Sequence, residues 1–498
     1  MRNHCADRTV LQYHTFLDIA LLIIGSVPES RQEWIQMQKY EQYKRMLRFL
    51  LSLLFTAAQA GVFYYTWMAY YNGLMESPFQ RKGNWLMAAF YTLLILLFAH
   101  MYSGWRIGAL KAFHLIWSQS LSLLFADAVI YLVITLLTKR FQTFLPLLAM
   151  FAAQCVFTGV WGMASTACYL RAYPPRRVLM VYGDRPNLGL ARKFHSREDR
   201  YIICETIHIS EGMGRIAERI REYEGVVIGD IPTPSRNRIL KYCYEQSVRT
   251  YTSPKISDIL IRSAESQHLF DTPILLSRNS GLTFEQRAVK RGVDIVFSLA
   301  AVAVLSPLMA VTALAVKLED GGPALFKQKR ATINGRVFEV LKFRSMIVNA
   351  EREGASVPAT EQDARITRVG RFIRAARIDE LPQLFNILKG EMSLVGPRPE
   401  RLEHVEKYSR DIPEFPYRLK VKGGLTGYAQ VYGKYNTTAY DKLKLDLTYI
   451  QNYSIRLDIE ILFQTVRILF MKESTEGFSE EASTEMTEYS KSRMRSGG

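Results

Sequence analysis

Four long apolar stretches dominate the first 171 residues of this 498-residue chain. Three contain no charged residue, and the fourth carries only Asp127; they run from Phe49 to Met75, Gly83 to Trp105, Ala112 to Thr138 and Phe141 to Leu170. Each is longer than the roughly 20 residues that a helix needs to cross a bilayer. The sequence therefore predicts a four-helix transmembrane domain over residues 49–171. We favour a helix–helix contact for Asp127 over a buried polar site.

Basic residues between the stretches predict the orientation of this domain. They gather before the first stretch, between the second and third, and after the fourth, as Lys39, Lys44, Arg45, Arg48, Arg106, Lys111, Arg171, Arg176 and Arg177. Because cytosolic loops carry the excess of Lys and Arg, the N-terminus and everything after residue 171 are expected in the cytosol. Residues 1–48 then form a cytosolic or interfacial segment, with an interfacial helix at 19–24 instead of a signal peptide.

The net charge predicts an anionic partner. The chain has 64 Lys and Arg against 47 Asp and Glu, a formal charge of +17. Nucleic acid, phosphorylated metabolites and an anionic membrane surface all suit that excess. Five scattered cysteines without a CxxC pair exclude a disulfide scaffold.

After a basic, proline-broken linker, residues 172–280 have the texture of an α/β domain. Short β-rich runs at 178–181, 201–204 and 226–228 alternate with helical segments at 212–223 and 236–245. This alternation predicts a small parallel sheet. No GxGxxG follows the first strand, so a structural or dimerising role is favoured over nucleotide binding.

A fifth apolar stretch, between Asp294 and Lys317, is long enough to span but is broken at its middle. Pro307 removes the backbone donor to the carbonyl of Ala303, and the hydroxyl of Ser306 can satisfy that group. Basic residues flank both ends of the stretch, and this pattern is typical of segments on the cytosolic side. A re-entrant helix over residues 294–317 is therefore favoured over a fifth crossing.

A basic β-hairpin is predicted next. Phe326 to Arg330 reads as one strand, Asn334-Gly335 as the turn, and Val337 to Phe343 as the partner strand. Alternation places Lys342 and Arg344 on one strand face, where both could bind phosphate oxygens. A solvated basic face is an equally good interpretation.

Two adjacent carboxylates, Asp379 and Glu380, lie at the start of a predicted helix. This helix ends at Gly390. Asp379 could simply cap that helix. However, Arg371, Arg374 and Arg377 precede the pair, so both carboxyls are expected to have depressed pKa values and to remain ionised. Such a pair could supply a nucleophile and a divalent-metal ligand.

A rigid loop follows, Gly396-Pro397-Arg398-Pro399. Two prolines restrict its backbone around one arginine, which suits a phosphate clamp.

In this order, the motifs over residues 285–470 closely resemble the bacterial sugar transferase family, the polyprenyl-phosphate hexose-1-phosphate transferases. The resemblance rests on Lys290-Arg291 with Asp294, Ser306-Pro307, FKQ at 326–328, KFRSM at 342–346, DELPQL at 379–384, MSLVGPRPE at 392–400 and GLTGYAQV at 424–431. Four N-terminal spans and a Rossmann-like module are similar to the long-form members.

The resemblance implies a three-part fold. An α-helical membrane bundle precedes a cytosolic Rossmann-like α/β module and a membrane-associated α+β catalytic domain with the re-entrant helix. The catalytic domain would cover residues 281–472, and 473–498 would be a disordered tail. Lys290, Arg291 and Asp294 would be structural residues at the membrane interface.

The resemblance also implies an activity. Family members move a hexose-1-phosphate from a UDP-hexose to undecaprenyl phosphate at the cytosolic face of the bacterial inner membrane, release UMP and so initiate surface polysaccharide or exopolysaccharide synthesis. Asp379 would form a phospho-aspartyl intermediate, Glu380 with Asp379 would hold Mg2+, and the phosphate-binding residues would be Lys342, Arg344, Arg377 and Arg398. A homodimer is compatible with this arrangement.

Two departures from the family pattern leave the sugar open. Ala331-Thr332 stands where glycine is usual, and Gly423 stands where proline is usual. A non-enzymatic membrane scaffold that binds anionic lipid remains the alternative function. Nucleic acid is not expected, because the basic residues lie in clamp motifs and not along a recognition helix.

Overall fold

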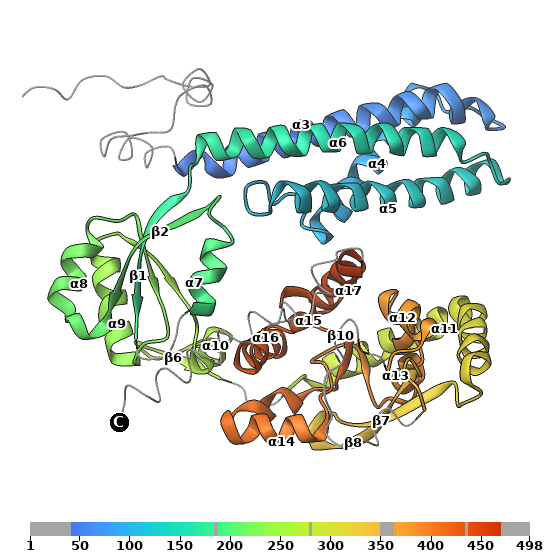
Figure 1. Cartoon of the computed structure of the whole chain (residues 1–498). Coiled ribbons are helices and arrows are strands. Elements are labelled where there is room, and N and C mark those ends of the chain that lie inside the picture. The colour runs from blue at the N-terminus through green and yellow to red at the C-terminus, as the bar shows by residue number, and fades with distance from the viewer. Residues whose placement is uncertain are drawn as a thin grey trace, which may run out of the picture. The chain divides into compact units, whose positions relative to one another are not determined.

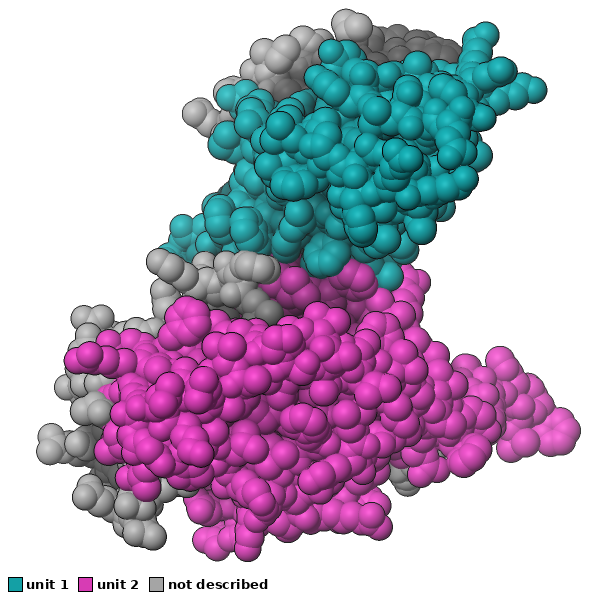
Figure 2. All heavy atoms as spheres, turned by 90° about the vertical axis from the view of Figure 1, so that its right-hand side faces the viewer, with its two compact units in different colours: residues 1–253 teal, residues 254–498 magenta. Residues whose placement is uncertain are grey.

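The computed structural model describes residues 41–183, 188–277, 281–348, 363, 365–433 and 437–469. The interfacial helix expected at 19–24 and the tail at 473–498 lie outside these residues. The chain divides into two compact units, Met1–Ser253 and Pro254–Gly498, which Figure 2 shows in separate colours. The predicted domain boundaries remain predictions.

Four long helices form the first part of unit 1: α3 (Lys44–Thr66), α4 (Arg81–Met101), α5 (Ala112–Thr138) and α6 (Leu145–Ala172). A π-helical turn and a 3-10 turn extend α3 to Leu74. Figure 1 shows α3 and α6 side by side. Within the described residues, five helices are long and apolar enough to cross a membrane, these four and α11 (Phe284–Asp320). The chain is a membrane protein, as its sequence predicts.

Polar side chains connect three of these helices inside the bundle. The hydroxyl of Tyr91 donates to Oδ1 of Asp127 at 2.6 Å, and Nε2 of Gln154 donates to the same hydroxyl at 2.8 Å. Asp127 therefore joins α5 to α4, and the Tyr91 hydroxyl extends the contact to α6, in agreement with the favoured interpretation.

A four-stranded parallel sheet completes unit 1. Its strands are β1 (Arg176–Tyr182), β2 (Tyr201–His208), β3 (Gly225–Ile228) and β4 (Arg249–Thr252), in the order β2-β1-β3-β4. The parallel sheet is confirmed, and β4 is a strand that the sequence analysis did not predict.

Helices cover both faces of this sheet (Figure 1). On one face, α8 (Met213–Ile220) and α9 (Thr233–Glu245) pack Ile216 and Ile239 against Leu179 and Val181 of β1. On the other face, α7 (Leu188–His195) packs Phe194 against Val178 and Met180. β1 is buried from both sides because its successive side chains point to opposite faces.

Unit 2 mixes helices with short two-stranded sheets. It begins with α10 (Ile256–Arg262), whose Ile256 and Ile259 join the same core as Leu443 and Leu447 of α16. Its other elements, besides α11, are β5 (Glu265–Leu269), β6 (Thr272–Leu276), β7 (Leu325–Ala331), β8 (Val337–Phe343), α12 (Arg368–Ala375), α13 (Gln383–Lys389), β9 (Ser393–Val395), α14 (Leu402–Asp411), β10 (Gly424–Thr426), α15 (Tyr428–Tyr432), α16 (Ala439–Gln451) and α17 (Ile455–Leu469).

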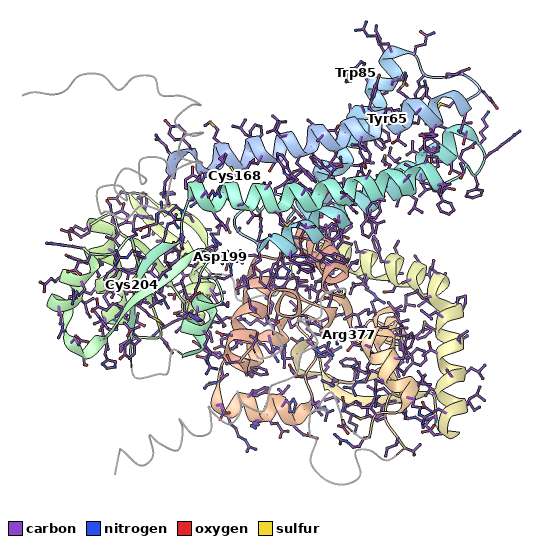
Figure 3. The ribbon with its side chains drawn as sticks, turned by 45° about the horizontal axis from the view of Figure 1, so that its top comes forward. Tyr65, Trp85, Cys168, Asp199, Cys204 and Arg377 are labelled. Atoms are coloured by element: carbon purple, nitrogen blue, oxygen red, sulfur yellow. The ribbon has the colours of Figure 1, made fainter. Side chains whose placement is uncertain are left out.

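The helix α11 runs for 37 residues with Pro307 inside it. The hydroxyl of Ser306 donates to the carbonyl of Ala303 at 3.0 Å, so the group that the proline leaves without a partner is satisfied as predicted. The α11 ribbon, pale yellow in Figure 3, changes direction along its length. Proline is a common cause of such a bend.

The basic hairpin is confirmed: β8 has its predicted bounds, and β7 is one residue longer at each end than predicted. β7 pairs antiparallel with β8, from Leu325 opposite Phe343 to Ala331 opposite Val337. Asn334 and Gly335 both have positive φ, 56° and 74°, which is the geometry that Asn-Gly favours at a tight hairpin turn.

Candidate active site

The Asp379-Glu380 pair lies in a tight turn between two helices. After α12, Arg377 adopts a left-handed φ of 58° and opens a 3-10 turn over Ile378–Glu380, and α13 follows from Gln383. Neither this turn nor α13 has a side-chain cap, so Asp379 is not the cap that the alternative interpretation required. Asp379 is 9% exposed. Among the described residues, its carboxylate makes no hydrogen bond.

Glu380 is held by two cations from separate elements. Nζ of Lys342, on β8, donates to Oε1 of Glu380 at 3.0 Å. A guanidinium nitrogen of Arg398, from the Gly396–Pro399 loop, donates to the same oxygen at 2.7 Å. The structure thus brings together four of the predicted site residues, Asp379, Glu380, Lys342 and Arg398.

The two carboxyls have opposite pKa shifts. Burial opposes ionisation of Glu380, but the positive charges of Arg398 and Lys342 outweigh it and hold its pKa well below the usual range. Burial raises the pKa of Asp379, and the charges of Lys342 and Arg377 only partly offset it. The expectation of depressed pKa values was therefore right for Glu380 and wrong for Asp379, because sequence alone did not reveal the burial of Asp379.

Burial and the neighbouring charges also shift the pKa values of the basic residues. Burial lowers the pKa of Lys342 despite the opposing charge of Glu380, whereas the charge of Glu380 raises the pKa of Arg398. Arg330 of β7 also belongs here: burial, followed by the charge of Arg398, lowers its pKa to about 10. Its guanidinium donates to the carbonyl of Pro399 at 3.0 Å.

A small pocket lies at these bases, lined by Arg330, Val340, Lys342, Gln383, Arg398, Pro399 and Gly424. Three cations and a glutamine amide would suit the oxygens of a phosphate or pyrophosphate group. A larger pocket lies in unit 1, lined in part by Lys44, Tyr169 and Arg176, and contains none of the predicted site residues.

The first half of α11 holds both motifs in place. Arg291 donates to the carbonyls of Ile387 and Leu388 at 2.5 and 2.7 Å and so binds the last turn of α13. Oδ1 of Asp294 accepts from the hydroxyl of Ser393 and the amide of Leu394, at 3.0 and 2.9 Å, just before the arginine loop. Lys290 pairs with Asp458 of α17 at 2.5 Å. All three residues make structural contacts.

Arg344 lies apart from the carboxylate pair. Its guanidinium pairs with Asp320 at the end of α11, and its side chain is only 8% exposed. The structure therefore does not bring Arg344 to Glu380 beside Lys342. Phosphate binding by Arg344 remains a prediction. Arg377, labelled in Figure 3, is exposed, and its positive charge acts on Asp379.

The two departures from the family pattern lie against each other. The amide of Gly423 donates to the hydroxyl of Thr332 at 3.2 Å, and that hydroxyl donates to the carbonyl of Glu391 at 3.0 Å. A proline at position 423 would have no N–H to donate. Thr332 and Gly423 therefore form a matched pair in this chain.

The carboxylate pair fits a magnesium ion through its donor chemistry. Mg2+ is usually held by one or two carboxylates together with substrate phosphates and water. Asp379 offers a carboxylate without a hydrogen bond, and Glu380 lies next to it. Nowhere in the described parts of the chain do three or more His, Cys, Asp or Glu side chains gather as a metal site.

Sequence reasoning missed two arginines of this region as functional residues, Arg330 and Arg418. Arg330 was assigned only to the basic hairpin, although its spacing from FKQ could have indicated a role. Arg418 donates to the carbonyl of Arg398 at 3.0 Å, and no motif marks it in the sequence.

Fold and site together define a membrane protein in which a buried aspartate and an adjacent, partly buried glutamate lie beside a basic pocket. Residues 285–472 match the family model described as bacterial sugar transferase. A UDP-N-acetylgalactosamine-undecaprenyl-phosphate N-acetylgalactosaminephosphotransferase of Aeromonas hydrophila is 41% identical over 235 residues, which is 47% of this chain and 55% of that protein.

Two glucose-1-phosphate transferases are also similar. The UDP-glucose:undecaprenyl-phosphate glucose-1-phosphate transferase of Caulobacter vibrioides is 44% identical over 183 residues, 36% of this chain and 68% of that protein. The protein of the same name from Escherichia coli strain K12 is 42% identical over 203 residues, 40% and 42% of the two chains. The matches cover 55%, 68% and 42% of the lengths of these three relatives, so the chain spans about half the length of two of them. It belongs to the bacterial sugar transferase family.

Proposed function

We propose that this protein is a phosphoglycosyl transferase that moves a hexose-1-phosphate from a UDP-sugar to undecaprenyl phosphate and releases UMP. The observation that carries the proposal is the Asp379 carboxylate, which is buried, makes no described hydrogen bond and lies beside a glutamate held by Lys342 and Arg398. The names of the relatives support the substrates, and such a transfer would initiate a surface polysaccharide or exopolysaccharide.

In the first step, a carboxylate oxygen of Asp379 attacks the phosphorus that carries the sugar. The bond from that phosphorus to the bridging oxygen breaks, and UMP leaves with the electron pair. Asp379 then carries the sugar phosphate as an acyl phosphate. In the second step, an oxygen of the lipid phosphate attacks the same phosphorus and frees the carboxylate. Burial suits this role, because a poorly solvated carboxylate is a stronger nucleophile.

The basic residues bind and orient the phosphates. Lys342, Arg398 and Arg330 line one small pocket, where their charges would stabilise the charge that develops on the pyrophosphate. Asp379 and Glu380 would hold Mg2+ with the substrate phosphates, and the ion would add further neutralisation of that charge.

We further propose that α11 is re-entrant and that the catalytic unit faces the cytosol at the bacterial inner membrane. Both ends of α11 bind the same unit: Arg291 binds α13 near one end, and at the other Glu319 accepts from the amides of Arg368 and Val369. A straight helix of 37 residues would extend about 55 Å and carry its ends to opposite sides of the bilayer.

For residues 172–280, we propose a Rossmann-like module with a structural or dimerising role. The parallel strand order β2-β1-β3-β4 with helices on both faces supports the fold. The missing GxGxxG motif argues against dinucleotide binding.

A nucleotide-sugar panel tests the activity. Membranes that contain the protein, given undecaprenyl phosphate, Mg2+ and one UDP-sugar at a time, are expected to release UMP with one or a few of the sugars. Release of UDP would mean that the sugar moves without its phosphate, which contradicts the proposal. Membranes without the protein are the control.

A further inference from the structure

The loop that carries Arg398 is fixed through its carbonyl groups. Prolines at 397 and 399 have no N–H, so this loop cannot hold itself through those amides. Instead, three successive carbonyls each accept a hydrogen bond from elsewhere in the unit. The carbonyl of Pro397 accepts from the amide of Gly424 at 2.9 Å, that of Arg398 from Arg418 at 3.0 Å, and that of Pro399 from Arg330 at 3.0 Å.

Arg418 differs from the other two donors because it is itself held by the buried Asp446 and the partly buried Glu400. Its Nε and a terminal nitrogen both lie close to Oδ2 of Asp446, at 2.9 and 2.7 Å, and another terminal nitrogen lies 3.6 Å from Oε1 of Glu400. The side chains of Arg418 and Asp446 are 4% and 1% exposed. Buried charges of this kind persist only when they are paired and hydrogen-bonded.

These contacts form one continuous path to the carboxylate pair. Asp446, on α16, holds Arg418; Arg418 holds the backbone of Arg398; and the side chain of Arg398 binds Glu380 at 2.7 Å. The ring of Phe415 lies 5.0 Å from the guanidinium of Arg418 and closes one side of it. Neither Arg418 nor Asp446 makes a described contact with Asp379 or Glu380, and the hydrogen-bonded route from Arg418 to Glu380 runs through Arg398.

We propose that Arg418, fixed by Asp446 and Glu400, is a positioning residue that sets Arg398 at the phosphate site. Arg418 does not touch the substrate. Its guanidinium spans two partners at once, the carboxylate of Asp446 and the carbonyl of Arg398, which the single ammonium of a lysine would not match. The effect on turnover rests on the proposed function, whereas the effect on the loop does not.

The test compares Asp446→Asn with Asp441→Asn, which removes a carboxylate from the same helix. Asp441 pairs with Lys444 at 3.4 Å, and its side chain is 33% exposed. Hydrogen exchange is read at the peptides that carry Gly396 and Gly424, whose amides donate to Thr426 and to the loop. Asp446→Asn is expected to speed exchange there about tenfold, and Asp441→Asn to leave it unchanged. Unchanged exchange in Asp446→Asn would overturn the proposal.

A double-mutant cycle with Arg398→Lys tests by enzyme activity whether Asp446 acts through Arg398. Asp446→Asn is expected to lower kcat/KM for the UDP-sugar about tenfold in the wild-type background but less than about twofold in the Arg398→Lys background, because its target is already impaired. Equal losses in both backgrounds would contradict a role through Arg398. Arg418→Lys serves as the second variant if Asp446→Asn does not fold, and the same pattern is expected. If the wild type releases no UMP, the proposed function fails, and the exchange measurement still decides the positioning role.

Discussion

Glu380 is kept ionised in a buried position by two cations that share one of its oxygens. Lys342 and Arg398 come from a hairpin and from a proline-bounded loop, so the two motifs meet at one carboxylate. The Glu380 side chain is only 12% exposed, so its negative charge would be costly without these two cations. Within the described residues, Lys342 and Arg398 bond to Glu380 and not to Asp379, which suits the role proposed for Asp379.

Removing one cation should therefore destabilise unit 2. We expect Lys342→Met to lower the free energy of unfolding by about 3 kcal/mol, because one partner of a largely buried ion pair is removed. The loss is not larger because Arg398 still pairs with Glu380. The matched control is Lys327→Met on the same hairpin, where the Lys327–Glu339 pair lies 62% and 53% exposed and should contribute less than about 1 kcal/mol. The free energy of unfolding of both variants is measured by urea unfolding in detergent, with proteolysis of unit 2 as the readout. Similar losses in the two variants would contradict the buried cluster.

Acid should weaken the same cluster. The folded pKa of Glu380 lies below its usual value of 4.5, so its contribution to stability is present above that pH and is lost as the pH falls. Asp379 has the opposite shift and the opposite sign. We expect Glu380→Gln to unfold with a shallower pH dependence between pH 7 and 3 than the wild type, as followed by the urea midpoint at each pH. An unchanged slope would show that Glu380 is not held ionised.

Sequence predicted the members of this site better than their partners. Asp379, Glu380, Lys342 and Arg398 stand in recognisable motifs, and the structure brings them together. Arg344 could not be placed, because its partner Asp320 lies 24 residues away on another element. The raised pKa of Asp379 was not predictable either, since it depends on burial by side chains remote in the sequence.

At the scale of elements, α11 acts as the frame for both motifs. Arg291 binds the last carbonyls of α13, so it stabilises the C-terminal end of the helix that follows the carboxylate pair. The elements with strong local signals were predictable: the Asn-Gly hairpin forms within one residue of its expected bounds, and Pro307 lies inside α11 where Ser306 satisfies the carbonyl of Ala303. The short strands β4, β9 and β10 were not predicted, because their pairing depends on distant partners, although the apolar run of the equally short β3 was.

Loss of Arg291 should loosen α13 and lower turnover. We expect Arg291→Met to cost at least about 1.5 kcal/mol, because two hydrogen bonds from a charged donor disappear and two carbonyls lose their partner. Arg287→Met, an exposed position one turn earlier on α11, should change stability by less than about 0.5 kcal/mol. Thermal unfolding and UMP release are measured for both. If Arg291→Met retains wild-type stability, α11 does not hold α13.

At the scale of the whole molecule, the +17 charge and the apolar helices serve one arrangement. The apolar helices place the chain in the membrane, and part of the positive charge gathers where phosphate groups would bind. Sequence predicted the membrane helices well, because span length and charge are local properties. Whether α11 crosses the membrane or returns to the same side depends instead on contacts at both of its ends.

Labelling tests that course. In a background without the native cysteines, Arg287→Cys and Lys327→Cys place one thiol on each side of the apolar part of α11. We expect a membrane-impermeant maleimide to label both only when the cytosolic face is open, because a re-entrant helix returns to the side from which it enters. Labelling of the two sites from opposite faces would make α11 a crossing helix.

The central claim is that Asp379 forms a covalent bond to the sugar phosphate. The most direct measurement is mass spectrometry of the peptide that contains Asp379, after the protein is mixed with its UDP-sugar and Mg2+ without lipid acceptor. The account predicts a mass increase equal to one sugar phosphate on Asp379, with an equal amount of UMP released, and neither in Asp379→Asn. Full UMP release by Asp379→Asn in the presence of undecaprenyl phosphate, without any adduct in the wild type, would contradict it.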